Sequence, residues 1–134
     1  MVAESNDPEW LVRLSAAEWM QAARKELNLA YEKLRRKKQR EGVAYARRSA
    51  GMALNAVLRR AFDPGYGRSY MDHLAALRDD VRAPDETRAA AGRLLGAPMR
   101  SDLVALGPGP TDLADAAAVI VDYCRIFSEA GGPS

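Results

Sequence analysis

Apolar residues recur at steps of three and four along most of this 134-residue chain, from Ser15 to Phe127. That spacing gathers them on one face of an α-helix, whereas a half-buried β-strand would alternate apolar and polar residues. Alanine, leucine and arginine, which favour helices, are abundant, and runs of β-branched residues are few. The sequence therefore predicts an all-α fold, and its length suits a single domain over residues 1–134.

Capping residues and helix breakers divide the chain into four to five helices. Residues 15–18 (Ser-Ala-Ala-Glu) have the form of a capping box, so the first long helix starts there. Gly42 marks the turn into the second helix, and Pro64 and Pro84 separate later ones. We expect an up-down bundle with helices at residues 15–39, 43–61, 71–81, 85–95 and 112–127, a lead-in at 1–14, a long loop at 96–110 and a disordered tail at 131–134.

The net charge of +2 hides an uneven distribution. Residues 1–60 carry 13 Lys and Arg against 7 Asp and Glu, while residues 61–134 carry 7 against 11. The basic residues are densest at 35–40 and resume in the pair Arg47-Arg48. Such a stripe can attract polyanions such as nucleic acids. A basic run also suits a helix C-terminus, where exposed carbonyls favour cations, so both interpretations stay open.

Several classes of site are excluded by what the chain lacks. Neither a GxxxxGK[ST] phosphate loop nor a GxGxxG turn occurs. Cys124 and His73 are the only cysteine and histidine, so an internal disulfide and a zinc site of nitrogen and sulfur ligands are both ruled out. The aspartate clusters fit helix capping and solvent exposure better than a cation site. We expect no metal and no cofactor.

The sequence also shows neither a signal-peptide pattern nor a membrane-spanning segment. The first residues lack the basic-then-apolar order of a signal peptide, and no segment approaches the ~18 unbroken apolar residues that cross a bilayer. The single cysteine fits a reducing compartment. We therefore expect a cytoplasmic protein without a membrane segment.

The one histidine lies close to an arginine at a predicted helix start. Residues 69–72 (Ser-Tyr-Met-Asp) repeat the capping-box pattern, which puts Arg68 just before the helix and His73 in its first turn. A histidine exchanges protons near neutral pH, and an arginine can hold a phosphate or a developing oxyanion. Arg68 and His73 are therefore the candidate catalytic pair. A histidine at such a place is also commonly a structural hydrogen-bonding residue, and that alternative stays open.

Neighbouring residues extend this candidate site, because a helix start offers unpaired amides to a phosphate and aromatic rings can stack a base. The candidate ligand-binding residues are Tyr66, Ser69, Tyr70, Asp72, Arg47 and Arg48. Metal-free RNA cleavage needs a base, an acid and a cation, and one His with one Arg supply half of that set. Two copies related by a twofold axis would complete it, so a homodimer is expected. Its candidate faces are this turn and the small-residue stripe of the helix at 43–61.

Part of the chain resembles a known family of helical domains. Residues 44–58, followed by a Gly/Pro loop and then residues 72–74 (Asp-His-Leu) with Leu77, look like the second and third helices of HEPN domains. The helix at 19–34 is similar to the family's first helix. The resemblance covers residues 15–81, and it implies a helical bundle that is commonly dimeric.

The resemblance to HEPN domains implies three kinds of role. Many members are ribonucleases of toxin or defence systems with an Arg-x(4–6)-His motif, whose spacing Arg68 and His73 match; others bind nucleotides, and others pair with a separately encoded nucleotidyltransferase. The family's motif usually lies on a later helix, and Ala75 stands where one branch has a tyrosine.

We therefore interpret the chain as a HEPN-like module that binds nucleotide or RNA, acting with a nucleotidyltransferase or in a toxin–antitoxin or defence system. The alternatives are a metal-independent ribonuclease that uses Arg68 and His73 across a homodimer, and a non-enzymatic helical oligomerisation protein.

Overall fold

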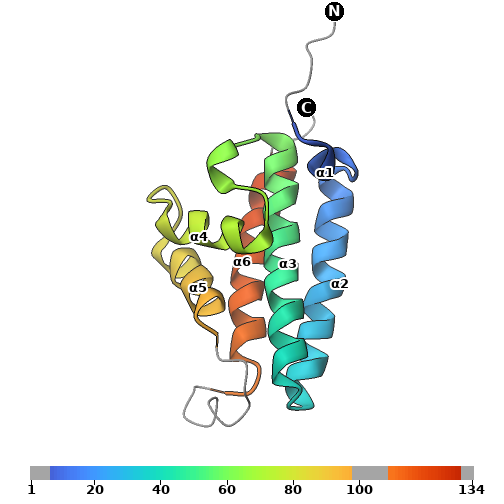
Figure 1. The fold of residues 1–134 in the computed structure, drawn as a ribbon, viewed down its shortest axis with the longest axis vertical. Helices are drawn as coiled ribbons and strands as arrows, with labels where there is room; N and C mark the ends of the chain where they lie inside the picture. Colours follow the sequence, from blue (N-terminus) through green and yellow to red (C-terminus); the bar gives the residue numbers. More distant parts are fainter. Residues whose placement is uncertain (1–6, 98–108, 131–134) are drawn as a thin grey trace, which may run out of the picture.

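The computed structural model of this protein describes residues 7–97 and 109–130, and within these ranges all regular structure is helical. In chain order the elements are α1 (Glu9–Val12), α2 (Ala16–Arg35), α3 (Gln39–Arg60), the 3-10 turn η1 (Pro64–Tyr66), α4 (Tyr70–Asp79), α5 (Asp85–Leu95) and α6 (Asp112–Ala130) (Figure 1). The predicted all-α bundle is confirmed. Where four to five helices were expected, the described residues form six, because part of the expected lead-in folds as α1.

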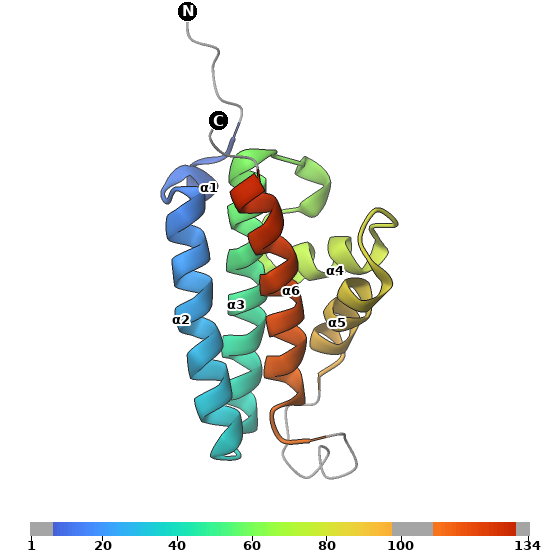
Figure 2. The same cartoon turned by 180° about the vertical axis from the view of Figure 1, so that it is seen from behind.

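Helix α3 is the centre of the bundle. It packs against α1, α2, α4, α5 and α6, while α6 also contacts α2 and α5. Figures 1 and 2 show that α2 and α5 run in one direction and α3 and α6 in the other, whereas α4 lies across the long axis. Among the described helices, none is both long and apolar enough to cross a membrane. The expected tail at 131–134 and most of the expected loop at 96–110 lie outside the described residues.

Both predicted capping boxes are present. The Ser15 hydroxyl accepts the Glu18 amide at 3.1 Å, and the Glu18 carboxylate accepts the Ser15 amide at 2.9 Å. Ser69 and Asp72 form the same reciprocal pair at the start of α4. Each pair satisfies amides that the first turn of a helix leaves without partners, which is why α2 and α4 begin where they do.

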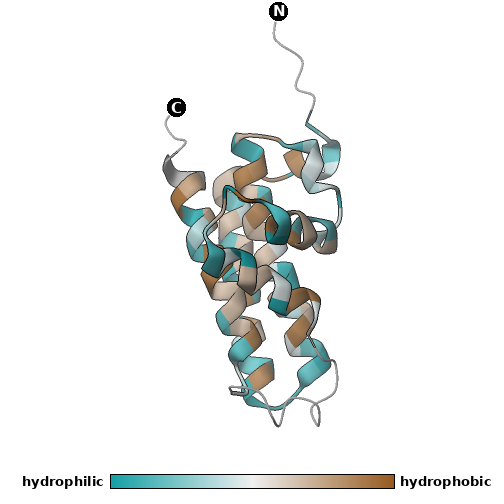
Figure 3. Ribbon diagram, turned by 90° about the vertical axis from the view of Figure 1, so that its left-hand side faces the viewer, coloured by the Kyte–Doolittle hydropathy of each residue, from teal (hydrophilic) through white to brown (hydrophobic). Residues whose placement is uncertain are grey.

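The turn between α2 and α3 differs from the expectation. Gly42 was predicted to mark it, but α3 already begins at Gln39, and the left-handed conformation is taken by Lys37 with φ 63°. Gly42 lies inside α3, where a Cβ atom would overlap the side chain of Leu34. The glycine thus lets α2 and α3 approach closely instead of turning the chain. The basic residues 35–40 surround this turn, which is a hydrophilic end of the bundle (Figure 3).

The small residues of α3 face the interior of the chain. Ala46, Ala50 and Ala53 are fully buried, and the Ser49 hydroxyl donates to the Ala23 carbonyl of α2 at 2.7 Å. This stripe was a candidate dimer face, and that prediction is wrong, because neighbouring helices of the same chain already cover it.

Gly51 of α3 should be intolerant of any side chain. A Cβ atom there would overlap the ring and the Cβ of Tyr70, the first residue of α4. Overpacking of this kind costs about 1–3 kcal/mol, which outweighs the ~1 kcal/mol by which alanine is favoured over glycine in a helix. We therefore expect Gly51→Ala to lower the free energy of unfolding, measured by urea denaturation.

Gly92 in the interior of α5 is the matched control. Its nearest neighbours would be side-chain carbons of Arg78 at 3.9 Å, which is ordinary contact. Gly92→Ala should therefore raise the free energy of unfolding by about 0.5–1 kcal/mol. Equal stability of the two variants would contradict the tight contact between α3 and α4.

Candidate ligand-binding site

His73 lies in the first turn of α4, as predicted, but its side chain is 0 % exposed. Its Nδ1 is 2.7 Å from the Tyr66 carbonyl oxygen, and its Nε2 is 2.8 Å from Oδ1 of the Asn55 side chain. The ring therefore connects α4 to α3 and to the η1 turn. Neither ring nitrogen is open to a substrate in this arrangement.

The protonation state of His73 follows from its surroundings. Burial lowers the pKa of the ring from its ordinary value of 6.5, against the opposing effects of the Tyr66 carbonyl and the Asp72 charge. The ring is then neutral at pH 7 and donates from one nitrogen only. The Tyr66 carbonyl can only accept, so the proton lies on Nδ1. A neutral ring of this tautomer leaves Nε2 as an acceptor, so the Asn55 amide, whose Oδ1 lies 2.8 Å from Nε2, has to exchange its oxygen and NH2 group by a half-turn to donate there.

Arg68 is exposed, and the depression that it lines does not include His73. It lines a pocket of about 350 Å³ whose other lining residues are Trp10, Arg13, Trp19, Asn55, Ser69 and Tyr70. His73 lies beneath this pocket, with its ring centroid 5.7 Å from that of Trp10 and 6.2 Å from that of Tyr70. The structure thus separates the predicted pair: the arginine faces the pocket and the histidine supports it.

Aromatic rings and guanidinium groups meet in this pocket. The Arg13 guanidinium lies over the ring of Trp19, 5.2 Å from its centre. A cation in this position is attracted by the electron-rich face of the ring. Trp19 itself is buried, and its indole donates to the Leu11 carbonyl at 2.8 Å, which ties α2 to α1. Burial raises the pKa of Tyr70, and the Arg13 charge opposes that shift, so the hydroxyl stays protonated at neutral pH beside a cation.

Ser69 and Asp72 hold the loop in front of α4. The Asp72 carboxylate oxygen that accepts the Ser69 amide of the capping box at 3.2 Å also accepts the Arg68 amide at 3.3 Å. These backbone hydrogen bonds keep the pKa of Asp72 below its usual value, so the carboxylate is charged. Asp72 was predicted as a ligand-binding residue, but the structure uses it to fix the Arg68 backbone.

Arg47 and Arg48 lie on other faces of α3 and are engaged within the fold. The Arg47 guanidinium donates to the carbonyls of Leu94 and Leu95 at the end of α5, at 2.8 and 3.2 Å. Arg48 donates to the Glu26 carboxylate at 2.7 Å and stacks over the Tyr45 ring. The structure does not bring them to the pocket that Arg68 lines.

Tyr66 points away from that pocket. Its hydroxyl donates to the Asp80 carboxylate at 2.7 Å, and burial together with this hydrogen bond raises its pKa well above the usual value. It lines a different cavity, between α3 and α6.

Four lining residues, Trp10, Arg13, Trp19 and Asn55, were missed from the sequence. Trp10 and Arg13 stand three positions apart, which places them on one face of a helical turn, so their spacing was the available signal. The partnership of Asn55 with His73 has no signal in the spacing, because 18 residues separate them.

Metal-binding side chains do not cluster in the described ranges: no group of three His, Cys, Asp or Glu residues is placed to hold an ion. Cys124 is buried and free, and burial raises the pKa of its thiol.

No model of a protein family, no curated protein and no solved structure matches this chain.

The buried His73 should make stability fall as the solution is acidified. Its pKa in the folded chain is lower than the ordinary 6.5, so below about pH 6.5 the unfolded chain binds more protons and the free energy of unfolding decreases. The slope can reach about 1.4 kcal/mol per pH unit. The depressed carboxylates, such as Asp72, titrate in a lower window, below their ordinary 3.8.

Denaturation of wild type and His73→Gln between pH 7.5 and 5.5 measures this slope, since the chain has no other histidine. We expect the variant to be less stable at pH 7.5 but nearly flat across the window. Stability of wild type that rises on acidification would instead mean a charged ring that donates from both nitrogens.

Proposed function

We propose that this protein binds a nucleotide or single-stranded RNA in the pocket lined by Arg13, Arg68, Trp10 and Tyr70. The observation that carries the proposal is the convergence of two exposed guanidinium groups and two partly exposed aromatic rings on one depression of about 350 Å³. Phosphates and bases are the ligand groups that such a combination recognises together.

Each part of the ligand has a matching group. Arg13 and Arg68 supply charged donors for phosphate oxygens. The Ser69 hydroxyl accepts the Asp72 amide and keeps its own proton to donate. Trp10 and Tyr70 supply partly exposed aromatic rings on which a base can stack, a contact that tolerates any base sequence.

The geometry favours binding over cleavage. Cleavage without a metal needs a group that takes and returns a proton, and His73 is the only histidine of the chain. Its ring is buried between Tyr66 and Asn55, so catalysis would require the ring to leave both partners. The ribonuclease assignment of Arg68 and His73 stays a prediction.

The HEPN resemblance motivates two further parts of the proposal. A HEPN-like module of this kind would act with a nucleotidyltransferase from another gene, or in a toxin or defence system, and would form a homodimer. Co-purification from the native host and light scattering of the pure protein test these associations separately from ligand binding.

Ligand binding can be read from two probes. Both tryptophans of the chain line the pocket, so AMP and ATP should quench tryptophan fluorescence, and a labelled ten-nucleotide RNA should give an anisotropy change. Arg13→Ala and Arg68→Ala should each weaken binding about fivefold, the size expected for an exposed ion pair. Tighter binding of RNA than of AMP would identify RNA as the ligand.

Arg40→Ala is the matched control, because it removes the same charge from the opposite end of α3, about 20 Å from Asn55. Its affinity should equal that of wild type. Equal weakening by Arg40→Ala would assign binding to the basic surface around the turn between α2 and α3. RNA cleavage by wild type that the folded His73→Gln variant lacks would replace this proposal with the ribonuclease.

A further inference from the structure

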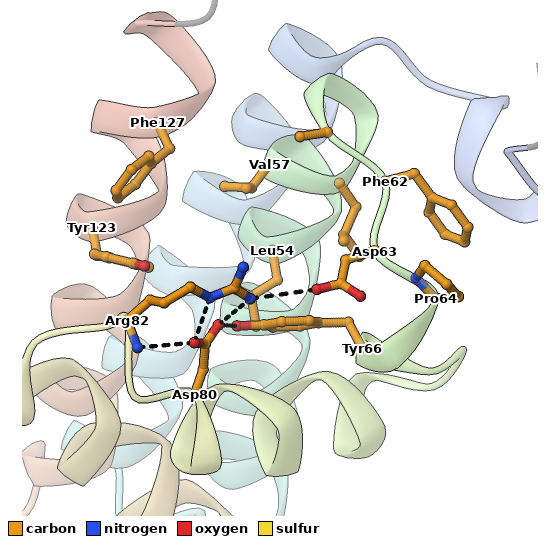
Figure 4. Close-up of a pocket in the computed structure, with 12 residues that line it drawn as sticks. Leu54, Val57, Phe62, Asp63, Pro64, Tyr66, Asp80, Arg82, Tyr123 and Phe127 are labelled. Atoms are coloured by element: carbon orange, nitrogen blue, oxygen red, sulfur yellow. Dashed lines mark hydrogen bonds and ion pairs between the residues drawn. The ribbon is translucent and has the colours of Figure 1, made fainter.

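A second and larger cavity, of about 510 Å³, lies between α3, α6 and the loops that flank α4 (Figure 4). Leu54 and Val57 of α3 form one wall and Tyr123 and Phe127 of α6 another. The volume is within the range of small-molecule sites, which combine apolar walls with a few placed polar groups. The pocket proposed for nucleotide does not share any of these residues.

The charged residues that line this cavity are Asp63, Asp80 and Arg82, so the lining carries a net charge of −1. The cavity also lies at the C-terminal end of α3, whose last carbonyls carry partial negative charge. The basic side chains of that helix end face elsewhere: Arg59 donates to the Leu14 carbonyl, and Arg59 and Arg60 line another depression. The electrostatic environment therefore favours a cation.

Arg82 shows how a cation is held here. Its guanidinium donates to the Asp80 carboxylate at 2.8 and 2.9 Å and lies 3.5 Å from an Asp63 oxygen (Figure 4). The Arg82 side chain is nevertheless 73 % exposed, whereas that of Asp80 is 11 % exposed and also accepts the Tyr66 hydroxyl. The carboxylates are thus fixed by the fold, and the cation that they hold is largely in water.

The Asp63 carboxylate offers a hydrogen-bonding position for a ligand cation. Its Oδ1 accepts the Gly65 amide at 2.9 Å, which fixes the carboxylate, and 42 % of its side chain is exposed at the mouth of the cavity. Since a carboxylate accepts about four hydrogen bonds, Asp63 can bind an ammonium group beside Arg82 or in its place.

We propose that this cavity binds a small organic cation with an apolar or aromatic body and a primary ammonium group. The body lies against Leu54, Val57 and Phe127, and the ammonium contacts Asp63. Apolar and aromatic walls suit the body of such a ligand, because contact with them removes its apolar surface from water. This site is additional to the proposed nucleotide pocket and does not depend on it.

Three probes of similar size and different charge test the ligand class: phenethylamine, 2-phenylethanol and 3-phenylpropanoate. Binding is measured by calorimetry at pH 7 and located by backbone amide shifts in NMR. We expect phenethylamine to bind most tightly, with shifts at residues 54–63 and 80–82 and at the end of α6. Tightest binding of the carboxylate would overturn the proposal, and so would shifts confined to other surfaces or the absence of binding.

Two variants should change phenethylamine affinity in opposite directions. Asp63→Asn keeps the acceptor for the Gly65 amide but removes the charge, so we expect about fivefold weaker binding. Arg82→Gln removes the internal competitor, so we expect about fivefold tighter binding. Asp85→Asn, a fully exposed carboxylate on α5, is the control and should bind like wild type.

The opposite signs separate ligand binding from a structural effect. Loss of packing in the loops would weaken binding in both variants, whereas competition for the carboxylates weakens one and strengthens the other. Weaker binding in Arg82→Gln, or unchanged binding in Asp63→Asn, would overturn the proposal.

Discussion

The hydrogen bonds of the buried His73 ring organise the surface features of this protein. A buried imidazole is stable only if its polar atoms find partners, and the partners here come from α3, through Asn55, and from the η1 turn, through the Tyr66 carbonyl. The same Tyr66 reaches Asp80 with its hydroxyl. The loop between α3 and α4 is thereby tied down on both sides, with one pocket beside Arg68 and the other beside Arg82.

Helix boundaries could be predicted where residues at the boundary itself, such as a capping serine, a proline or a glycine, determine them. The helix at Asp85–Leu95 begins and ends as expected, after a proline and before a glycine, and the capping residues Ser15 and Ser69 start the helices that they were predicted to start. The turn after α2 was misplaced, because Lys37 adopts the left-handed conformation that glycine usually takes. Gly42 is needed for contact with a neighbouring helix, a tertiary constraint without a signature in local spacing.

The candidate site was predictable in location but not in the orientation of its residues. The sequence placed Arg68 and Ser69 at a helix start, and both line the pocket there. It could not show that His73 points inward, since that depends on Asn55, far away in the chain. The charge pattern likewise marked Arg47 as a candidate ligand residue, whereas its guanidinium binds carbonyls at the end of α5. Contacts between side chains that lie far apart in the sequence are determined by the packing of the helices.

The central claim is that His73 supports the proposed nucleotide pocket from within the core and does not react with ligand. The most direct test is the side-chain ¹⁵N NMR spectrum of the single histidine at pH 7, recorded with and without RNA or AMP. The account predicts a neutral ring protonated on Nδ1 in both spectra, while the indole signals of Trp10 and Trp19 shift when ligand is added. A ring that is charged at pH 7, or histidine nitrogens that shift more than the indoles, would contradict it.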